Sequence, residues 1–335
     1  MYQVNDAGYL TIDEEETLYY WQCPYDCDTF MTRVGSAAAS ENAVRDSYRL
    51  TDNMLGGGRI LTFKDTVFTR VQPEENNGAR RVLALQKNQA GFEVYQPPSE
   101  LDAFDVSDFG VDQDQRVFTW YVDLESAAVY LVEHRGDHSR VQFGLPLHDE
   151  DINDYNIPGR TEVDSTGIYF DFRDHVYLAN KKDWDDVSDE LPPLQEPELL
   201  SDGSIGGHHG RKLYVVKRSG ANDEGLRVDE FDLKRDTTQK VTAFNDAETR
   251  VRSYFVSPDI VFWSNGYEIY RLPFGENGQG ELIWTVNKKD TPWVDFDELE
   301  IQSLGFLGYS NEILYYAMTN MRMDGQEYVY RLPIK

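Results

Sequence analysis

Residues 259–273 read Asp-Ile-Val-Phe-Trp-Ser-Asn-Gly-Tyr-Glu-Ile-Tyr-Arg-Leu-Pro. Strand-forming residues lie on both sides of Asn265-Gly266, a dipeptide that favours two-residue β-hairpin turns because both residues tolerate positive φ. Residues 252–258 before this hairpin and Glu281–Val286 after it are also typical of strands, and turn-forming residues separate the segments. The stretch therefore predicts one antiparallel sheet of four strands.

The pair Val261-Phe262 in this hairpin has six counterparts along the chain. Each follows a polar, turn-like stretch, and the aromatic residues recur at a mean interval of about 49 residues: Leu18-Tyr19, Val67-Phe68, Val117-Phe118, Val176-Tyr177, Leu213-Tyr214 and Leu314-Tyr315. A fixed period of this length carried by strand-forming residues is typical of β-propeller blades. We therefore expect an all-β fold, a seven-bladed β-propeller in which each pair marks the second strand of a blade.

The period assigns residues 1–335 to a single propeller domain. The predicted blades cover approximately 8–52, 57–98, 104–147, 160–200, 203–245, 250–287, and 300–335 together with 1–5. The last period contains only three strands, so Tyr2-Gln3-Val4 is expected to supply the fourth and close that blade. In the fourth blade the inner strand should begin near Gly167, and prolines after Asn180 oppose regular pairing of its outer strands, which makes six blades the fallback.

The stretch 259–273 resembles the repeat of low-density-lipoprotein-receptor-type (Tyr-Trp-Thr-Asp) propellers and of TolB-like bacterial propellers. Residues Glu312–Tyr316, followed by Asp324-Gly325 and Tyr328–Leu332, repeat the pattern. The resemblance implies the propeller fold and a scaffold or recognition role, because those families bind partners and have no catalytic set to carry over. The sialidase-type box, the regular Gly-Gly of kelch repeats and paired Gly-His and Trp-Asp at blade spacing do not occur.

The charge balance is strongly acidic, with 60 acidic and 32 basic residues and a net charge of −28. Nucleic acid and anionic membranes are unfavourable partners because their binding requires a clustered basic surface. A basic protein, a cationic ligand or a divalent metal fits better, although solubility or a saline habitat explains the charge equally well. No stretch approaches the roughly 20 apolar residues of a membrane span. Residues Met1–Asn5 lack a secretory signal, which fits a cytoplasmic protein or a trimmed exported form.

The long acidic loops are the predicted partner-binding face. Connections from fourth to first strands and from second to third strands share one face of a propeller. Here they are Cys23–Asp28, Gln72–Ala79, Pro97–Asp105, His148–Thr161, Lys181–Leu191, Asn287–Glu300 and Asn320–Gln326. Aromatic residues among carboxylates can anchor a basic partner by apolar burial and charge pairing. The predicted partner-binding residues are Trp184, Asp185, Trp293, Asp295, Phe296, Asp297 and Glu298. The alternative is that these aromatic residues only pack onto the blade rim.

Metal and thiol sites have weaker signals. Asp149, Asp151 and Asp154 could offer oxygen ligands to calcium, but they lack the glycine-centred spacing of an EF-hand loop, and a solvated acidic loop is the alternative. Cys23 and Cys27 could form a disulfide, stay as free thiols, or bind a metal with two further ligands. Apart from this weak calcium signal, no cofactor is expected.

Histidine and nucleophile patterns give no catalytic site. His208-His209 follow Gly206-Gly207, and neighbours on a regular strand point to opposite faces, so they cannot share one metal. A polar channel lining or an edge turn is the expected role there, and a surface role is expected for His134 and His138. No Gly-x-Ser-x-Gly elbow occurs, and neither cysteine has an evident base partner.

The sequence favours a non-enzymatic binding or scaffold propeller that recognises a basic protein, with a bacterial inhibitor or immunity-type role as one version. The alternative is a hydrolase or lyase that acts on a carbohydrate or phosphoester with a bound divalent metal. A third reading is a structural module of a larger secreted assembly.

Overall fold

The computed structural model describes residues 2–4, 7–13, 15–22, 28–33, 48–49, 54–73, 79–87, 92–135, 138–153, 156–181, 191–219, 225–233, 237–243, 250–276, 278–287, 303–320 and 326–334. The chain divides into two compact units: unit 1 is Met1–Asp52 with Lys212–Lys335, and unit 2 is Asn53–Arg211. Strands dominate both units. Within the described residues, no helix is long and apolar enough to cross a membrane.

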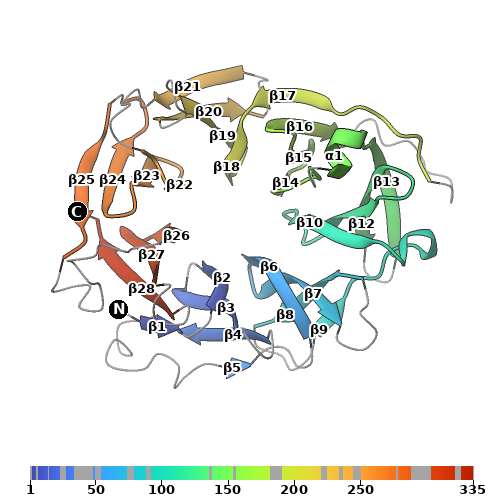
Figure 1. Cartoon of the computed structure of the whole chain (residues 1–335), viewed down its shortest axis with the longest axis horizontal. Coiled ribbons are helices and arrows are strands. Elements are labelled where there is room, and N and C mark those ends of the chain that lie inside the picture. Colours follow the sequence, from blue (N-terminus) through green and yellow to red (C-terminus); the bar gives the residue numbers. More distant parts are fainter. Residues whose placement is uncertain are drawn as a thin grey trace. The chain divides into compact units, whose positions relative to one another are not determined.

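Unit 2 contains three four-stranded sheets, each with its strands in chain order. Their strands are β6 (Met54–Phe63), β7 (Thr66–Pro73), β8 (Arg81–Gln86), β9 (Phe92–Val94), β10 (Asp105–Val111), β11 (Val117–Asp123), β12 (Ala128–Arg135), β13 (His138–Pro146), β14 (Thr161–Val163), β15 (Gly167–Phe172), β16 (His175–Asn180) and β17 (Glu198–Asp202). Strand β18 (Ser204–His209) follows, while the 3-10 turn η2 (Ser99–Leu101) precedes β10 and helix α1 (Asp149–Asn153) precedes β14. Figure 1 shows β6, β10 and β14, the first strands of the three sheets, on one side of this unit.

Unit 1 supplies the remaining strands. They are β1 (Tyr2–Val4), β2 (Ala7–Ile12), β3 (Thr17–Gln22), β4 (Asp28–Arg33), β5 (Tyr48–Arg49), β19 (Lys212–Ser219), β20 (Gly225–Asp232), β21 (Thr237–Ala243), β22 (Ser253–Val256), β23 (Ile260–Ser264), β24 (Glu268–Pro273), β25 (Glu281–Thr285), β26 (Ser303–Ser310), β27 (Ile313–Asn320) and β28 (Gln326–Pro333). Their sheets have the orders β2-β3-β4-β5, β22-β23-β24-β25 and β1-β28-β27-β26, and a further sheet has the order β18-β19-β20-β21. In total, the described strands form seven four-stranded sheets, as expected for propeller blades. The predicted all-β propeller class is confirmed.

The N-terminal strand completes the last sheet as predicted. Strand β1 pairs antiparallel with β28, and Gln3 lies opposite Tyr328. The first residues of the chain therefore cover the edge of β28, which would otherwise expose unpaired backbone groups.

The apolar-aromatic pairs form the interior of the sheets. Six of the seven lie on second strands, namely β3, β7, β11, β19, β23 and β27, and every residue of these six pairs is at most 1% exposed. Each buried side chain of this size contributes about 1.5–3 kcal/mol to folding. The sequence period therefore reflects the core of the molecule.

The seventh pair corrects the assignment of the fourth blade. Val176-Tyr177 lies in β16, the third strand of its sheet, and Gly167 begins β15, the second strand. The first strand is instead β14, whose three residues contain no aromatic side chain. Such a short segment carries almost no periodic signal, so the sequence does not predict it as a strand.

The proline-containing segment 191–197 runs beside β13. Leu194 forms a parallel bridge with Gly144, and the Gln195 N–H donates a 2.8 Å hydrogen bond to the Gly144 carbonyl. The outer edge of β13 is therefore covered by the chain itself. The segment itself is irregular, but the prediction that the prolines oppose pairing of the outer strands is wrong, because the five-residue strand β17 follows them and pairs antiparallel with β16.

A buried aspartate recurs in the turn between first and second strands. In three sheets the Oδ1 atom of this aspartate accepts hydrogen bonds from two backbone N–H groups. Asp13 accepts from Glu15 and Thr17, Asp112 from Asp114 and Arg116, and Asp164 from Thr166 and Gly167. Such side-chain-to-backbone bonds fix tight turns. Part of the acidic composition is therefore structural.

Candidate functional site

Two irregular first strands bring Arg59 and Asp108 together in unit 2. The register of β6 against β7 shifts between Gly56 and Ile60, and that of β10 against β11 shifts between Val106 and Phe109. Such bulges redirect side chains, and the Gly56-Gly57-Gly58 run before Arg59 suits the first of them. The result is an Arg59 Nη1 atom 3.7 Å from Asp108 Oδ2.

Arg59 connects three first strands. Its Nη1 donates to the Thr161 carbonyl at 2.9 Å and to the Phe109 carbonyl at 3.4 Å, while Nη2 donates to Glu162 Oε1 at 2.8 Å. Burial alone would lower the pKa of Arg59, but the carboxylates of Glu162 and Asp108 raise it above its ordinary value. Arg59 therefore stays charged and joins β6, β10 and β14.

Glu162 is the carboxylate at the centre of this cluster. Burial would raise its pKa, but Arg59, Arg160 and His208 lower it below the ordinary range. Arg160 Nε lies 3.1 Å from Glu162 Oε1, and Arg160 Nη1 donates to the carbonyls of Ile205 and Gly206 in β18. The cluster thereby also holds β18.

Two other carboxyl groups of the cluster, in contrast to Glu162, have pKa values above the ordinary range. Burial raises the pKa of Asp108, and Arg59 only partly offsets the effect. Burial also raises the pKa of Asp171 to about 6, although Asp171 Oδ1 accepts the Ile205 N–H at 2.7 Å. Asp108 Oδ2 and His208 Nε2 are buried and have no hydrogen-bond partner within the described part of the chain. We call Arg59, Asp108, Arg160, Glu162, Asp171 and His208 the polar cluster.

The polar cluster joins strands β6, β10, β14 and β18 through ion pairs and hydrogen bonds. Among the residues that the structure describes, no group of three or more His, Cys, Asp or Glu side chains is placed to hold a metal ion. The chemistry available here is proton binding and charge pairing in a partly dry site.

A groove of about 570 Å³ lies at the turn end of the unit 2 sheets. Its walls come from β7, the segment before β8, the start of β10, the β11–β12 turn and Ile157. Arg70 on β7 donates to the carbonyls of Ser107 and Val106 on β10, and Asp108 of the cluster follows directly in sequence. The groove and the polar cluster therefore share one strand. We call this groove the turn-end groove.

The turn-end groove combines apolar and acidic side chains. Phe104, Val106, Val122 and Leu124 line it, and Leu124 is 45% exposed. Asp105, Asp123 and Glu125 also contribute, as do Arg70 and Arg80. A volume of this size accommodates several side chains of a partner. The predicted loops Gln72–Ala79, Pro97–Asp105 and His148–Thr161 each contribute to it.

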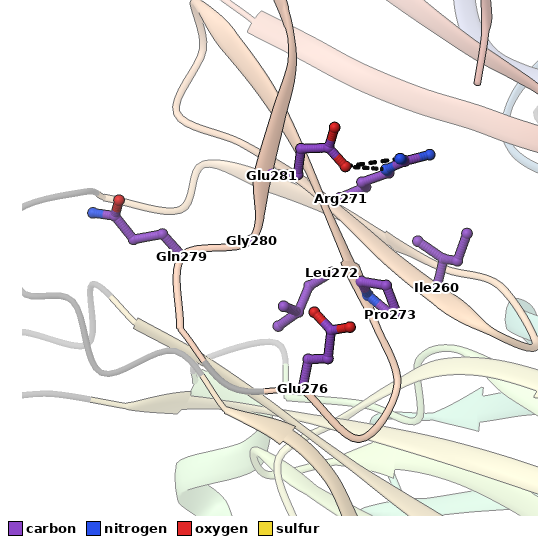
Figure 2. Close-up of a pocket in the computed structure, with 8 residues that line it drawn as sticks. All are labelled: Ile260, Arg271, Leu272, Pro273, Glu276, Gln279, Gly280 and Glu281. Carbon is purple, nitrogen blue, oxygen red and sulfur yellow. Dashed lines mark hydrogen bonds and ion pairs between the residues drawn. The ribbon is translucent and has the colours of Figure 1, made fainter. Parts of the chain in front are cut away.

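A second groove, of about 750 Å³, lies in unit 1 on the β22–β25 sheet (Figure 2). Arg271 makes two 2.7 Å contacts with Glu281 Oε2 along one wall, and Ile260 and Leu272 supply apolar surface. Gly280 has φ +81, and a Cβ atom there would lie 2.4 Å from the Arg271 carbonyl oxygen. Arg271 and Glu281 pair with each other, and Glu276 adds one further carboxylate to the lining.

Most sequence-predicted site residues lie outside the described residues: Trp184, Asp185, Trp293, Asp295, Phe296, Asp297, Glu298, Cys23, Cys27 and Asp154. The two described calcium candidates have different environments. Asp149 is exposed in α1, whereas Asp151 is 3% exposed and accepts bonds from Arg173 at 2.9 and 2.6 Å. Asp151 is thereby engaged in an ion pair, which together with the His148 N–H keeps its pKa low despite burial.

The histidine expectations need one correction. His138 is exposed, but His134 is 3% exposed and lies 2.8 Å from Thr119 Oγ1. Burial lowers the pKa of His134 to about 4, so it is a neutral core residue rather than a surface group. His208 lies on the first strand β18, as the sequence predicts, whereas no sequence pattern points to Arg59, Asp108, Arg160 or Glu162.

No protein-family model and no curated protein matches the sequence. Among solved structures, the chain is similar to a prolyl endopeptidase, with 10% identity, a TM-score of 0.56 and coverage of 99% of this chain and 50% of that one. It thus spans about half the length of that enzyme. It is also similar to the β-propeller domain of the trilobed protease from Pyrococcus furiosus (9% identity, TM-score 0.53, coverage 98% and 96%) and to the C-terminal WD40 domain of Sif2 (12%, 0.51, 98% and 82%). Identities this low show the β-propeller fold alone.

Proposed function

We propose that this chain is a non-enzymatic binding propeller that recognises a basic protein partner. The observation that carries the proposal is the turn-end groove, in which the exposed Leu124 lies beside the carboxyl-bearing residues Asp105 and Glu125. An apolar anchor with acidic neighbours matches a partner segment that has an aliphatic or aromatic residue next to Lys or Arg. The net charge of −28 supports the same choice of partner.

The acidic loop residues belong to the same proposal. Trp184, Asp185, Trp293, Asp295, Phe296, Asp297 and Glu298 would add aromatic and acidic contacts to the partner. A TolB-like or low-density-lipoprotein-receptor-type repeat and an inhibitor or immunity-type role are compatible with this function. Neutralising Asp295, Asp297 and Glu298 together should weaken binding if the loop takes part.

The test is a selection of random displayed peptides on the immobilised full chain. We expect the enriched peptides to combine Lys or Arg with Leu, Phe or Trp, and their affinity to fall as salt is raised, because exposed charge pairs are screened. Enrichment of acidic peptides, or of none, would contradict the proposal. The same selection on an Arg80→Ala variant shows whether the positive charge of Arg80 in the groove affects which peptides are enriched.

A second candidate function is a hydrolase or lyase that acts on a carbohydrate or phosphoester, with a divalent metal such as calcium. The observation that favours it is the polar cluster, since buried carboxyl groups with raised pKa values can act as general acids. Hydrolysis of chromogenic glycosides or phosphoesters that disappears in Asp171→Asn and is unchanged in Asp174→Asn would support it. Equal turnover by both variants would exclude the cluster as its site.

A further inference from the structure

Three exposed leucines lie within one short segment of unit 2. Leu191, Leu194 and Leu199 are 40%, 42% and 54% exposed, and half of the large hydrophobic residues exposed in the described part of the chain are in this segment. Isolated exposed leucines are ordinary, but several on one segment indicate a contact surface. We call residues 191–199 the leucine segment.

The leucine segment packs against β13 through its backbone and through Leu194, whose Cδ2 atom would lie 2.9 Å from a Cβ atom at Gly144. The Gln195 N–H bonds to the Gly144 carbonyl, the parallel bridge joins Leu194 to Gly144, and Leu199 lies opposite Tyr177. Figure 1 shows the chain that leads into β17 passing beside β13. Pro192, Pro193 and Pro197 have no N–H groups, so this segment cannot serve as the template for a further regular strand. Any partner must therefore recognise its side chains.

The charge around the leucines selects the class of partner. Residues 191–202 include Glu196, Glu198 and Asp202 but no Lys or Arg. Glu196 has a 60% exposed side chain and lies 3.9 Å from Arg173 Nη1 and 3.7 Å from His148 Nε2, and Asp202 lies 3.3 Å from His175 Nδ1. Glu198 is exposed, and no ion pair with it is described. A partner that carries Lys or Arg beside its apolar side chains can pair with the exposed Glu198 carboxylate.

We propose that the leucine segment is a docking surface for a basic protein that presents apolar side chains between Lys or Arg residues. The proposal does not depend on the turn-end groove, because it rests on different residues. Leucines bury apolar area against the partner, while the neighbouring carboxylates pair with its cations and disfavour acidic proteins.

The probe for the test is a short fluorescent peptide of alternating Leu and Lys, and the control probe has Ser in place of Leu. Binding of both to the full chain is measured by anisotropy at about 0.15 M ionic strength. Wild type should bind the Leu-containing peptide at least about tenfold more tightly than the control peptide. The triple variant Leu191→Ser, Leu194→Ser, Leu199→Ser should lose most of this difference, whereas Phe92→Ser and Leu282→Ser should keep it.

A further variant and a common background keep the test independent of folding and of the proposed function. Glu198→Lys leaves the leucines in place and should weaken the Leu-Lys peptide about threefold through charge repulsion. All these proteins are compared in a Leu124→Ser background, so that binding of the probe in the turn-end groove does not contribute to the measured difference. Equal affinities of wild type and triple variant, or equal losses in the Phe92 and Leu282 variants, would overturn the proposal. Self-association of the wild type that the triple variant abolishes would also overturn it.

Discussion

Asp171 shows how burial sets the chemistry of a single residue in the polar cluster. Burial is the largest cause of its raised pKa, the carboxylates of Asp108 and Glu162 add to it, and the Ile205 N–H and Arg160 oppose it. Asp171 therefore titrates near pH 6, while Glu162 remains ionised beside its two arginines. One cluster thus contains both a group that exchanges a proton near neutrality and a group that does not.

The first prediction concerns the pH dependence of stability. The folded pKa of Asp171, about 6, exceeds its ordinary value of 3.8, so the folded state holds the proton more tightly than the unfolded state. This contribution to stability is complete below the unfolded pKa and is lost as the pH rises through 6. Asp171→Asn should therefore be more stable than wild type at about pH 7.5, by on the order of 1–3 kcal/mol, and similar at about pH 4.

Urea unfolding of both proteins at several pH values measures this difference. Asp174→Asn, at an exposed neighbouring position, should follow the wild-type pH profile. An Asp171→Asn protein that is destabilised at neutral pH, or that keeps the wild-type slope between pH 4 and 7, would show that the carboxyl is not buried at this cost.

The second prediction concerns Arg59. Its removal leaves Glu162 and Asp108 without their shared cation, so Arg59→Met should lower the free energy of unfolding by about 2–4 kcal/mol; the 25% exposure of Arg59 makes this less than for a fully buried pair. Arg59→Lys should lower the free energy of unfolding by less, because lysine keeps the positive charge although it lacks the planar guanidinium group. Chemical denaturation checks both, and the exposed Arg80→Ala should change stability by less than about 0.5 kcal/mol. Equal stability of Arg59→Met and wild type would contradict a stabilising role of Arg59 between these strands.

At the scale of the element, β10 connects the core, the polar cluster and the turn-end groove. Val106 and Ser107 line the groove, Asp108 belongs to the cluster, and Gly110 faces β14. A Cβ atom at Gly110 would lie 2.7 Å from Val163 Cγ2 and 3.2 Å from the Thr161 carbonyl oxygen. This glycine allows the close approach of β10 and β14 that Arg59 then bridges.

The third prediction follows from this contact. Gly110→Ala should destabilise the protein by about 1–3 kcal/mol, because the added methyl group must displace β14 or its side chains. Thermal unfolding measures the change. Gly305→Ala is the matched control, since a Cβ atom there meets nothing within 4 Å. A neutral Gly110→Ala would mean that the two strands can separate without loss.

Elements also show what the sequence could reveal. Six second strands were predictable because each buries a Val or Leu next to an aromatic residue, and Asn265-Gly266 marked the hairpin between β23 and β24. The short β14 leaves no periodic pattern, so the sequence places the first strand of the fourth blade at Gly167, where the second strand β15 begins. The polar cluster was not predictable, since Arg59, Asp108, Glu162 and His208 are far apart in sequence and meet only through bulges and strand packing. The Gly56-Gly57-Gly58 run was the one local signal of a bulge.

At the scale of the whole molecule, the fold uses its first residues to complete its last sheet. The pairing of β1 with β28 was predictable because the final period contained only three strands. Function was less accessible, because a propeller core is shared by proteins of many activities and recognition depends on turns and loops.

The fourth prediction tests this closure. Deleting residues 1–4 should lower the thermal midpoint and increase self-association, because the edge of β28 becomes available for pairing with another chain. Sedimentation velocity measures the association. The double variant Tyr2→Thr, Val4→Thr keeps the strand and should remain monodisperse to the same degree as wild type. A truncated chain with unchanged stability and sedimentation would show that β1 contributes nothing to the last sheet.

The most direct test of the proposed function is the affinity of a selected basic, apolar peptide for the Leu124→Arg variant. The substitution removes the exposed apolar anchor of the turn-end groove and adds a charge that repels the peptide. We predict at least about tenfold weaker binding by calorimetry, and unchanged binding for Leu282→Arg, which places the same change on the exposed strand β25. Equal affinity of wild type and Leu124→Arg would contradict recognition through this groove.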